Sequence, residues 1–193
     1  MNSAIDTLHH LFTLFAMTQS RITNIPIFLL FHFQYRLLES YDLNLVNLST
    51  SSLLLQYMSF FAFGGSNAIS SIDLSNAYNG ISDFNITIVG VLTFVSNWAG
   101  PIWWTSATTL LLLRKAQREG GGAQVFLGHA TIQTLFSACS VAAVMAACTV
   151  LRTHLFVWTV FSPKYLYCVA WSLGQHMLVN IGFGGLLFWL GSL

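Results

Sequence analysis

Apolar stretches of helical length alternate with short polar connectors along the whole chain. The apolar stretches are residues 5–19, 26–39, 51–63, 84–113, 125–151 and 165–190. Several of them approach or exceed the roughly 20 residues that an α-helix needs to cross a bilayer. The pattern predicts an all-α protein, a polytopic transmembrane helical bundle with about four to six membrane segments.

The first two apolar stretches are shorter than a complete span. Each can be half of a broken span, an interfacial helix or a full span with polar ends, and the pattern leaves these alternatives open. Residues 41–50 have the composition of a polar connector. The third helix is therefore expected to begin at a cap formed by Ser51 or Ser52 and to end at Gly64-Gly65.

The longest apolar stretch, residues 84–113, exceeds the thickness of the membrane core. As a straight helix it would measure roughly 45 Å, against a hydrocarbon core of about 30 Å. Gly100-Pro101 lies in its middle and predicts a kink, because proline removes one backbone hydrogen bond. Trp98 and Trp103 flank this dipeptide. Since indole rings favour the membrane–water boundary, both are candidate lipid-side residues.

The composition supports an integral membrane protein. Of the 193 residues, 55% are hydrophobic and only 7% are charged, whereas a soluble domain has about 25% charged residues. The net charge of +1 argues against binding to DNA or RNA, which requires a basic face. The three cysteines lie in apolar stretches without a Cys-x-x-Cys pair, so they indicate neither a disulfide framework nor a zinc site.

One short connector carries the clearest signal for the orientation in the membrane. Arg114, Lys115 and Arg118 are three of the seven basic residues of the chain, and all lie in residues 114–124. Because cytosolic loops are enriched in Lys and Arg, this loop is predicted to be cytosolic. The helix before it then starts on the opposite side, which predicts a luminal position for residues 65–83.

Residues 65–83, which we call the polar loop, form the longest polar stretch. Polar and apolar residues alternate there. One interpretation is a hydrated turn of the Asx type. The other is a surface that presents polar groups to a lipid headgroup or a partner. Under the second interpretation the candidate residues are Asp73, Asn76, Tyr78, Asn79 and Asp83.

A second boundary segment, residues 153–164, combines His154 and Lys164 before the next apolar stretch. Anchoring at the interface accounts for Lys164, whose long stem can lie along apolar surface while its charge stays in water. His154 has no equally simple explanation. Both residues are therefore candidates for contact with a lipid or another substrate.

No catalytic motif is present. The six acidic residues form no evident acid/base pair, and the six histidines are scattered. There is no zinc-protease, nucleophile-elbow, phosphate-loop or dinucleotide motif. We therefore predict no catalytic residue and no metal site within the chain.

Polar and small residues inside the apolar stretches are predicted to serve helix packing. Gln175, His176 and Asn180 are interpreted as partners in hydrogen bonds between helices, with a functional role as the alternative. Alanines 138, 142 and 146 recur every four residues. Such a stripe predicts a close helix–helix interface.

Three long motifs resemble a known family. They are "SNAISSIDLSNAYNGISDFN" at residues 66–85, "VGVLTFVSNWAGPIWW" at 89–104 and "HLFVWTVFSPKYLY" at 154–167. The chain resembles, over residues 24–189, the C-terminal membrane region of the fungal glycosylphosphatidylinositol (GPI) ethanolamine phosphate transferases. The first two motifs favour the branch of the family that modifies the second mannose.

The resemblance implies a role in GPI-anchor biosynthesis. These enzymes transfer ethanolamine phosphate from phosphatidylethanolamine to a mannose of the GPI precursor, in the lumen of the endoplasmic reticulum. The implied location is the endoplasmic reticulum membrane, with several passes. The implied partners are phosphatidylethanolamine, the GPI precursor and a small stabilising membrane subunit, without nucleic acid.

In the family, the chemistry belongs to an N-terminal luminal domain of the alkaline-phosphatase type, with bound zinc ions and a threonine nucleophile. No position in residues 1–193 matches these groups, so we expect a single C-terminal transmembrane domain without the catalytic domain, inactive alone and without a cofactor. The start at Met1 fits a truncated gene model or a separate short product. The alternative function is a stand-alone multispan protein, either a small transporter or channel subunit or a partner-binding scaffold.

Overall fold

The computed structural model describes residues 2–66, 71–155 and 157–192. Met1 and residues 67–70 of the polar loop therefore lie outside the described residues. The described part is helical with irregular connections, which confirms the all-α prediction. The α-helices are α1 (Asn2–Thr18), α2 (Ile25–Ser40), α3 (Leu45–Ala62), α4 (Ile86–Asn97), α5 (Ala99–Glu119), α6 (Gly122–Val150), α7 (Ser162–Ala170) and α8 (Gly184–Ser192).

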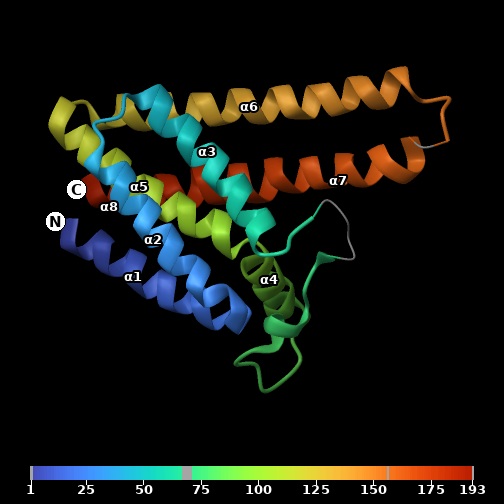
Figure 1. The fold of residues 1–193 in the computed structure, drawn as a ribbon, viewed down its shortest axis with the longest axis horizontal. Coiled ribbons are helices and arrows are strands. Elements are labelled where there is room, and N and C mark those ends of the chain that lie inside the picture. The colour runs from blue at the N-terminus through green and yellow to red at the C-terminus, as the bar shows by residue number, and fades with distance from the viewer. Residues whose placement is uncertain (1, 67–70, 156, 193) are drawn as a thin grey trace.

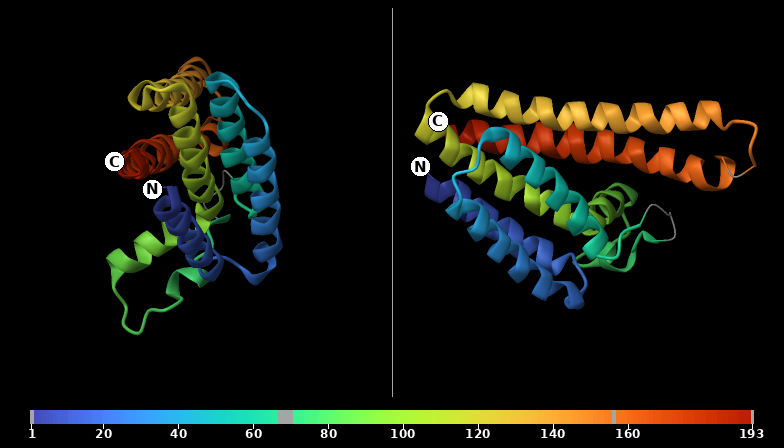
Figure 2. Two further views of the ribbon diagram at one scale, coloured as in Figure 1. Left: turned by 90° about the vertical axis from the view of Figure 1, so that its left-hand side faces the viewer. Right: turned by 45° about the horizontal axis from the view of Figure 1, so that its top comes forward.

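Two long antiparallel helical segments form one side of the molecule (Figure 1). The first is α6. The second is continuous from α7 through the π-helix η5 (Trp171–Phe183) to α8; we call the pair the long hairpin. Helices α1, α3 and α5 contact it, whereas α2 packs against α1 and α5. Both termini lie near the turn between α5 and α6 (Figures 1 and 2). The polar loop and the connection between α6 and α7 lie away from that end.

The two arms of the long hairpin are long and apolar enough to cross a membrane. They contain 29 residues (Gly122–Val150) and 31 residues (Ser162–Ser192). Helices α4 and α5 pass the same test only as a pair and are bent by 71°. By length and composition the structure thus has two candidate spans, or three if the bent pair is one span, among the described residues.

The bend between α4 and α5 follows from Pro101. A proline ring clashes with the carbonyl group four residues earlier and lacks the N–H that would bond to it. Four residues before Pro101 is Asn97, where α4 ends, and α5 restarts at Ala99. Pro101 thus lies in the first turn of α5, where a missing N–H costs little. The break predicted at Gly100-Pro101 is confirmed, a few residues earlier.

Helix α5 forms the centre of the bundle. All its residues from Ala99 to Leu113 are buried, because α1, α3, α6 and α8 contact it from several sides. A helix that is buried around its whole circumference occupies such a central position. The outer surface of α6 is apolar as well, with Leu127 and Leu135 more than half exposed, as expected for side chains that face lipid.

Two details of the predicted packing are wrong. Helix α3 begins at Leu45 rather than near Ser51, because the Asn44 side chain accepts a hydrogen bond from the Asn47 N–H at 2.8 Å and caps the helix. The alanines at 138, 142 and 146 are exposed. Helix α6 turns a different face, which includes Gln133 and Ser137, toward the second arm of the hairpin.

The predicted terminator Gly64 is confirmed by its φ of +83°, a conformation that favours glycine.

Candidate functional site

The polar loop is held against the C-terminal end of α4 by a pair of backbone contacts. The Asp73 N–H donates to Asn97 Oδ1 at 2.9 Å, and Asn97 Nδ2 donates to the Asp73 carbonyl at 2.9 Å. The side-chain amide of Asn97 thereby pairs with both backbone groups of one loop residue. This pairing fixes the position of Asp73 relative to the helix.

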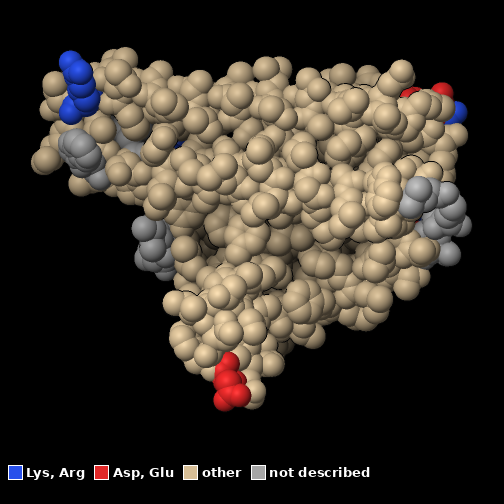
Figure 3. All heavy atoms as spheres, turned by 180° about the vertical axis from the view of Figure 1, so that it is seen from behind, with Lys and Arg blue, Asp and Glu red and all other residues tan. Residues whose placement is uncertain are grey.

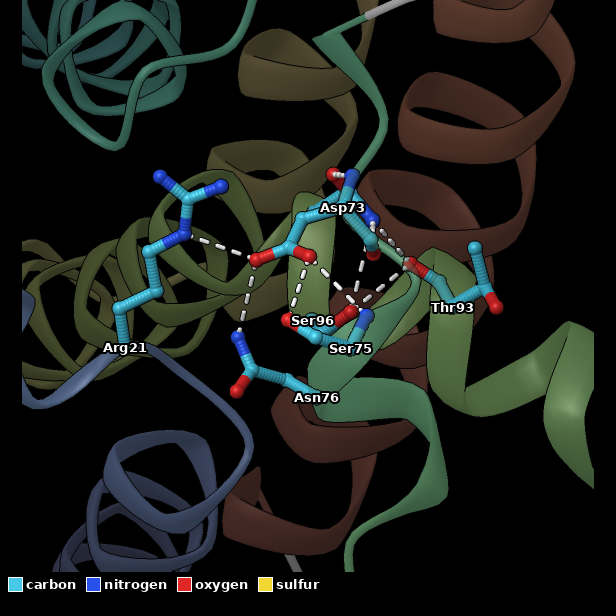
Figure 4. Close-up of polar contacts among 7 residues, drawn as sticks. Arg21, Asp73, Ser75, Asn76, Thr93 and Ser96 are labelled. Atoms are coloured by element: carbon cyan, nitrogen blue, oxygen red, sulfur yellow. Dashed lines mark hydrogen bonds and ion pairs between the residues drawn. The ribbon is translucent and has the colours of Figure 1, made fainter.

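The Asp73 carboxylate gathers donors from the loop and from the turn between α1 and α2 (Figure 4). One oxygen accepts from the Ser75 N–H at 3.0 Å and from the Ser75 hydroxyl at 2.6 Å. The other accepts from Arg21 Nε at 2.8 Å and from Asn76 Nδ2 at 3.2 Å. The bond to the Ser75 N–H is the Asx turn predicted from the sequence. With four donors the carboxylate is well satisfied, so its visible role is to hold the loop together.

These donors lower the pKa of Asp73 to about 2, from its usual 3.8; the Ser75 hydroxyl contributes most and Arg21 next. A depressed folded-state pKa means that the ionised carboxylate stabilises the loop above about pH 4. This stabilisation is lost as the pH falls through the folded-state pKa.

We therefore expect Asp73→Asn to be less stable than the wild-type chain at pH 7 and to match it near pH 2. The physical reason is that the variant side chain cannot ionise. It therefore lacks the stabilisation by a charged carboxylate, which the wild-type protein has at pH 7 and loses on acidification. Unfolding in detergent, followed by circular dichroism across this pH range, measures the difference. A stability gap that stays constant from pH 7 to pH 2 would contradict the assignment.

The tip of the polar loop presents further polar groups. Asn79 Nδ2 donates to the Thr18 carbonyl at the end of α1, at 3.2 Å. Tyr78 is 51% exposed, and Asp83 is exposed as well. Of the five loop candidates, Asp73, Asn76 and Asn79 thus have internal partners, whereas Tyr78 and Asp83 point outward. Contact of any of them with a substrate stays a prediction.

The two candidate tryptophans lie inside the bundle. Trp98 stacks on Phe94 with ring centroids 5.1 Å apart and is 6% exposed. Trp103 is 1% exposed, and its Nε1 donates to Thr13 Oγ1 at 2.8 Å. The bend before α5 turns both rings toward neighbouring helices. The structure gives them a packing role, and a role toward lipid stays a prediction.

His154 and Lys164 are exposed and belong to the connection between α6 and α7 and to the start of α7. This connection and the polar loop lie on the side of the molecule away from the α5–α6 turn (Figure 2). The two segments are nevertheless well apart, with the connection at the tip of the long hairpin and the polar loop beside α4 (Figure 1), and among the described interactions no contact joins the two residues to the loop candidates.

Charged side chains gather at the ends of the bundle. Around the α5–α6 turn, Arg114 pairs with Glu39 and lies 3.6 Å from Asp6, and Lys115 donates to Glu119 at 2.6 Å. Figure 3 shows one face on which acidic and basic atoms appear only at the margins, with uncharged atoms between them. An uncharged belt between charged ends is the arrangement that a bilayer requires.

A small pocket lies beneath the polar loop. Its volume is about 30 Å³, and its walls include Arg21, Asp73, Asn76 and Asn97. A space of this size admits about a water molecule, so the loop offers an outer surface rather than a cavity for a sugar or a headgroup. Among the described residues, no group of three or more His, Cys, Asp or Glu side chains is placed to hold a metal ion.

A family model for the GPI ethanolamine phosphate transferase membrane region matches residues 1–193. The chain belongs to this family. It is 56% identical over 174 residues to a protein named GPI ethanolamine phosphate transferase 2 of Aspergillus oryzae, a match covering 90% of the chain. Its identity is 54% over 162 residues to the protein of that name in Aspergillus fumigatus (84% of the chain) and 39% over 213 residues to that of Yarrowia lipolytica (92%).

The chain spans about a fifth of the length of these relatives, from 20% of the Aspergillus proteins to 25% of the Yarrowia protein. It is therefore similar to the membrane region of GPI ethanolamine phosphate transferase 2, in agreement with the resemblance noted in its motifs. No solved structure matches the chain significantly.

The transferase membrane region also contains a buried polar cluster between its helices. Gln56 Oε1 accepts from Gln175 Nε2 at 3.2 Å and from Asn180 Nδ2 at 3.1 Å, and Thr105 Oγ1 donates to Asn180 Oδ1 at 2.6 Å. His176 Nε2 lies 3.0 Å from Thr134 Oγ1. The predicted hydrogen bonds of Gln175, His176 and Asn180 between helices are confirmed.

Sequence reasoning missed Arg21 and Asn97 as parts of the polar site. Residues 20–24 carried only a turn signal, and Asn97 lay within a long apolar stretch. One signal was available for Arg21, because it is one of only seven basic residues and follows the first apolar stretch, on the same side as the polar loop. For Asn97 there was none, since its partner is 24 residues away.

Proposed function

We propose that this membrane region serves an enzyme that transfers ethanolamine phosphate from phosphatidylethanolamine to the second mannose of the GPI precursor. Membership of the family supports the reaction class, and the match to proteins named GPI ethanolamine phosphate transferase 2 supports the branch. The catalytic groups belong to a domain outside this chain. The region's own task is to hold the lipid-borne substrates at the membrane surface and to support that domain.

The proposed location is the endoplasmic reticulum membrane, with residues 114–124 in the cytosol and the polar loop in the lumen. The cluster of Arg114, Lys115 and Arg118 supports this orientation. In it, the polar loop and the α6–α7 connection share the luminal side. A small stabilising membrane subunit, expected from the family, stays a prediction.

One observation carries the proposal for the polar loop: Asp73 is tied to both Arg21 and Asn97. These ties fix an ordered surface from which Tyr78 and Asp83 project. An ordered polar surface at a membrane boundary suits recognition of headgroups and sugar hydroxyls, because its groups need no reorganisation on binding.

The experiment measures transfer to a GPI precursor by a complete transferase that contains this region. Replacing Asp73, Asn76 and Asn79 with Ala should lower the transfer rate about ten-fold or more, because a displaced loop no longer positions the substrates. The protein level should stay the same by immunoblot. Tyr78→Ala with Asp83→Ala should raise KM with a smaller change in kcat if these exposed groups contact the substrate.

The matched control is Glu119→Ala, at the opposite end of the bundle, which should leave transfer unchanged. Full activity of the triple variant at normal protein level would refute the proposed role of the loop.

A further inference from the structure

A cavity of about 330 Å³ opens where α6 meets the connection to α7. This volume falls within the range of ligand pockets, about 300–1,000 Å³. The cavity has about ten times the volume of the pocket beneath the polar loop, which measures about 30 Å³. Its walls are formed by Met145, Cys148, Thr149, Arg152, Val157, Ser162 and Tyr165.

The lining of the cavity is amphipathic. Met145, Cys148 and Val157 supply apolar surface, whereas Arg152 supplies a guanidinium group and Tyr165 a hydroxyl. Most of the exposed wall is apolar. A fully hydrated polar ligand would leave this apolar surface in contact with water, which is unfavourable. A ligand that fits must carry a hydrocarbon part and one group that accepts hydrogen bonds from a cation.

The charge around the cavity is positive. Arg152 belongs to none of the ion pairs found among the described residues, and Lys164 nearby is exposed. Of the two acidic residues of the polar loop, Asp73 is paired with Arg21, whereas Asp83 is exposed and forms none of the ion pairs found among the described residues, with Arg152 or with any other cation. In Figure 3 the basic atoms at the far end of the long hairpin have no acidic atoms beside them. An anionic group on a ligand would therefore complement the positive charge around the cavity.

The cavity lies at the end of both arms of the long hairpin, the two candidate membrane spans. Its polar rim is therefore at the membrane boundary and its apolar wall at the depth of the acyl chains. The molecules that present a phosphate and a hydrocarbon chain at this depth are the glycerophospholipids of the bilayer.

We propose that this cavity binds a resident glycerophospholipid, with its phosphate at Arg152 and one acyl chain along Met145 and Val157. A guanidinium group donates two parallel hydrogen bonds to a phosphate, which favours Arg over a point charge. The site recognises the phosphate and the chain rather than a particular headgroup. It is separate from the polar loop and holds whether or not the loop takes part in ethanolamine phosphate transfer.

The test uses the complete 193-residue chain in detergent micelles and native mass spectrometry. The probes are palmitoyl-oleoyl phosphatidylethanolamine, palmitoyl-oleoyl phosphatidylglycerol, dioleoylglycerol and glycerol 3-phosphate. The wild-type chain should retain one molecule of either phospholipid and neither of the other two probes. Arg152→Gln should lower phospholipid retention at least about five-fold, because the charge-assisted hydrogen bonds are lost, and Arg152→Lys should retain more than Arg152→Gln.

Arg118→Gln is the matched control, because it removes the same charge at the other end of the bundle and should leave retention unchanged. Met145→Trp fills the cavity from its apolar side and should also displace the lipid. This variant tests the proposal if circular dichroism shows that Arg152→Gln does not fold. Three outcomes would overturn the proposal: equal retention by folded Arg152→Gln and wild type, equal retention of dioleoylglycerol, or an equal loss in Arg118→Gln.

Discussion

Gly100→Ala should lower the free energy of unfolding by about 1–3 kcal/mol, the usual cost of overpacking a tight site. A Cβ atom at Gly100 would lie 2.8 Å from the Ser59 Cβ and 3.2 Å from the Ser59 backbone carbon. The backbone of α3 cannot move away easily, because α3 and α5 share the most extensive helix–helix contact of the bundle. Steric overlap therefore outweighs the better helix propensity of alanine.

Gly90→Ala is the matched control. A Cβ atom at Gly90 in α4 would meet nothing within 4 Å, so this variant should keep its stability or gain up to about 1 kcal/mol from helix propensity. Unfolding of the full chain in increasing dodecyl sulfate, followed by circular dichroism, measures both variants. Equal stability of the two variants would contradict the close approach of α3 and α5 at this point.

The second large effect is expected for Gln56→Leu, which should destabilise the bundle by about 1–3 kcal/mol. Gln56 Oε1 is the acceptor shared by Gln175 and Asn180, and all three side chains are buried. Leucine has a similar volume but leaves these donors without that acceptor, at positions shielded from solvent. The reason for the loss is the unpaired Asn180 amide, not a cavity, since Gln175 Nε2 keeps acceptors at Thr105 Oγ1 and Asn180 Oδ1.

Gln133→Leu is its control, with the same substitution at an equally buried residue. Gln133 is 2% exposed, as is Gln56, but its Nε2 has no hydrogen-bond partner among the described residues. Removing an unpaired buried amide should leave stability unchanged or raise it slightly. The same unfolding measurement applies, and a loss in Gln133→Leu as large as that in Gln56→Leu would show that amide pairing does not explain the effect.

The exposed candidates of the functional site were largely evident from the sequence, and their arrangement was not. Tyr78, Asp83, His154 and Lys164 were identified because they are polar residues in an apolar chain, and they are exposed in the structure. Trp98 was assigned to the boundary by residue type, but the bend before α5 buries it. Amino-acid type predicts a preferred environment, and only the direction of the helix decides which environment the side chain reaches.

The sequence by itself determined the helical class, the membrane setting and the break before α5, because each depends on local composition or on one residue such as Pro101. Only the tertiary structure decided that α5 is central, that Ala138, Ala142 and Ala146 face outward, and that Arg21 and Asn97 meet at Asp73. These facts depend on the rotation and direction of each helix relative to the others. Hydropathy changes little when a helix rotates in a membrane, so packing and hydrogen bonds between distant residues fix that rotation.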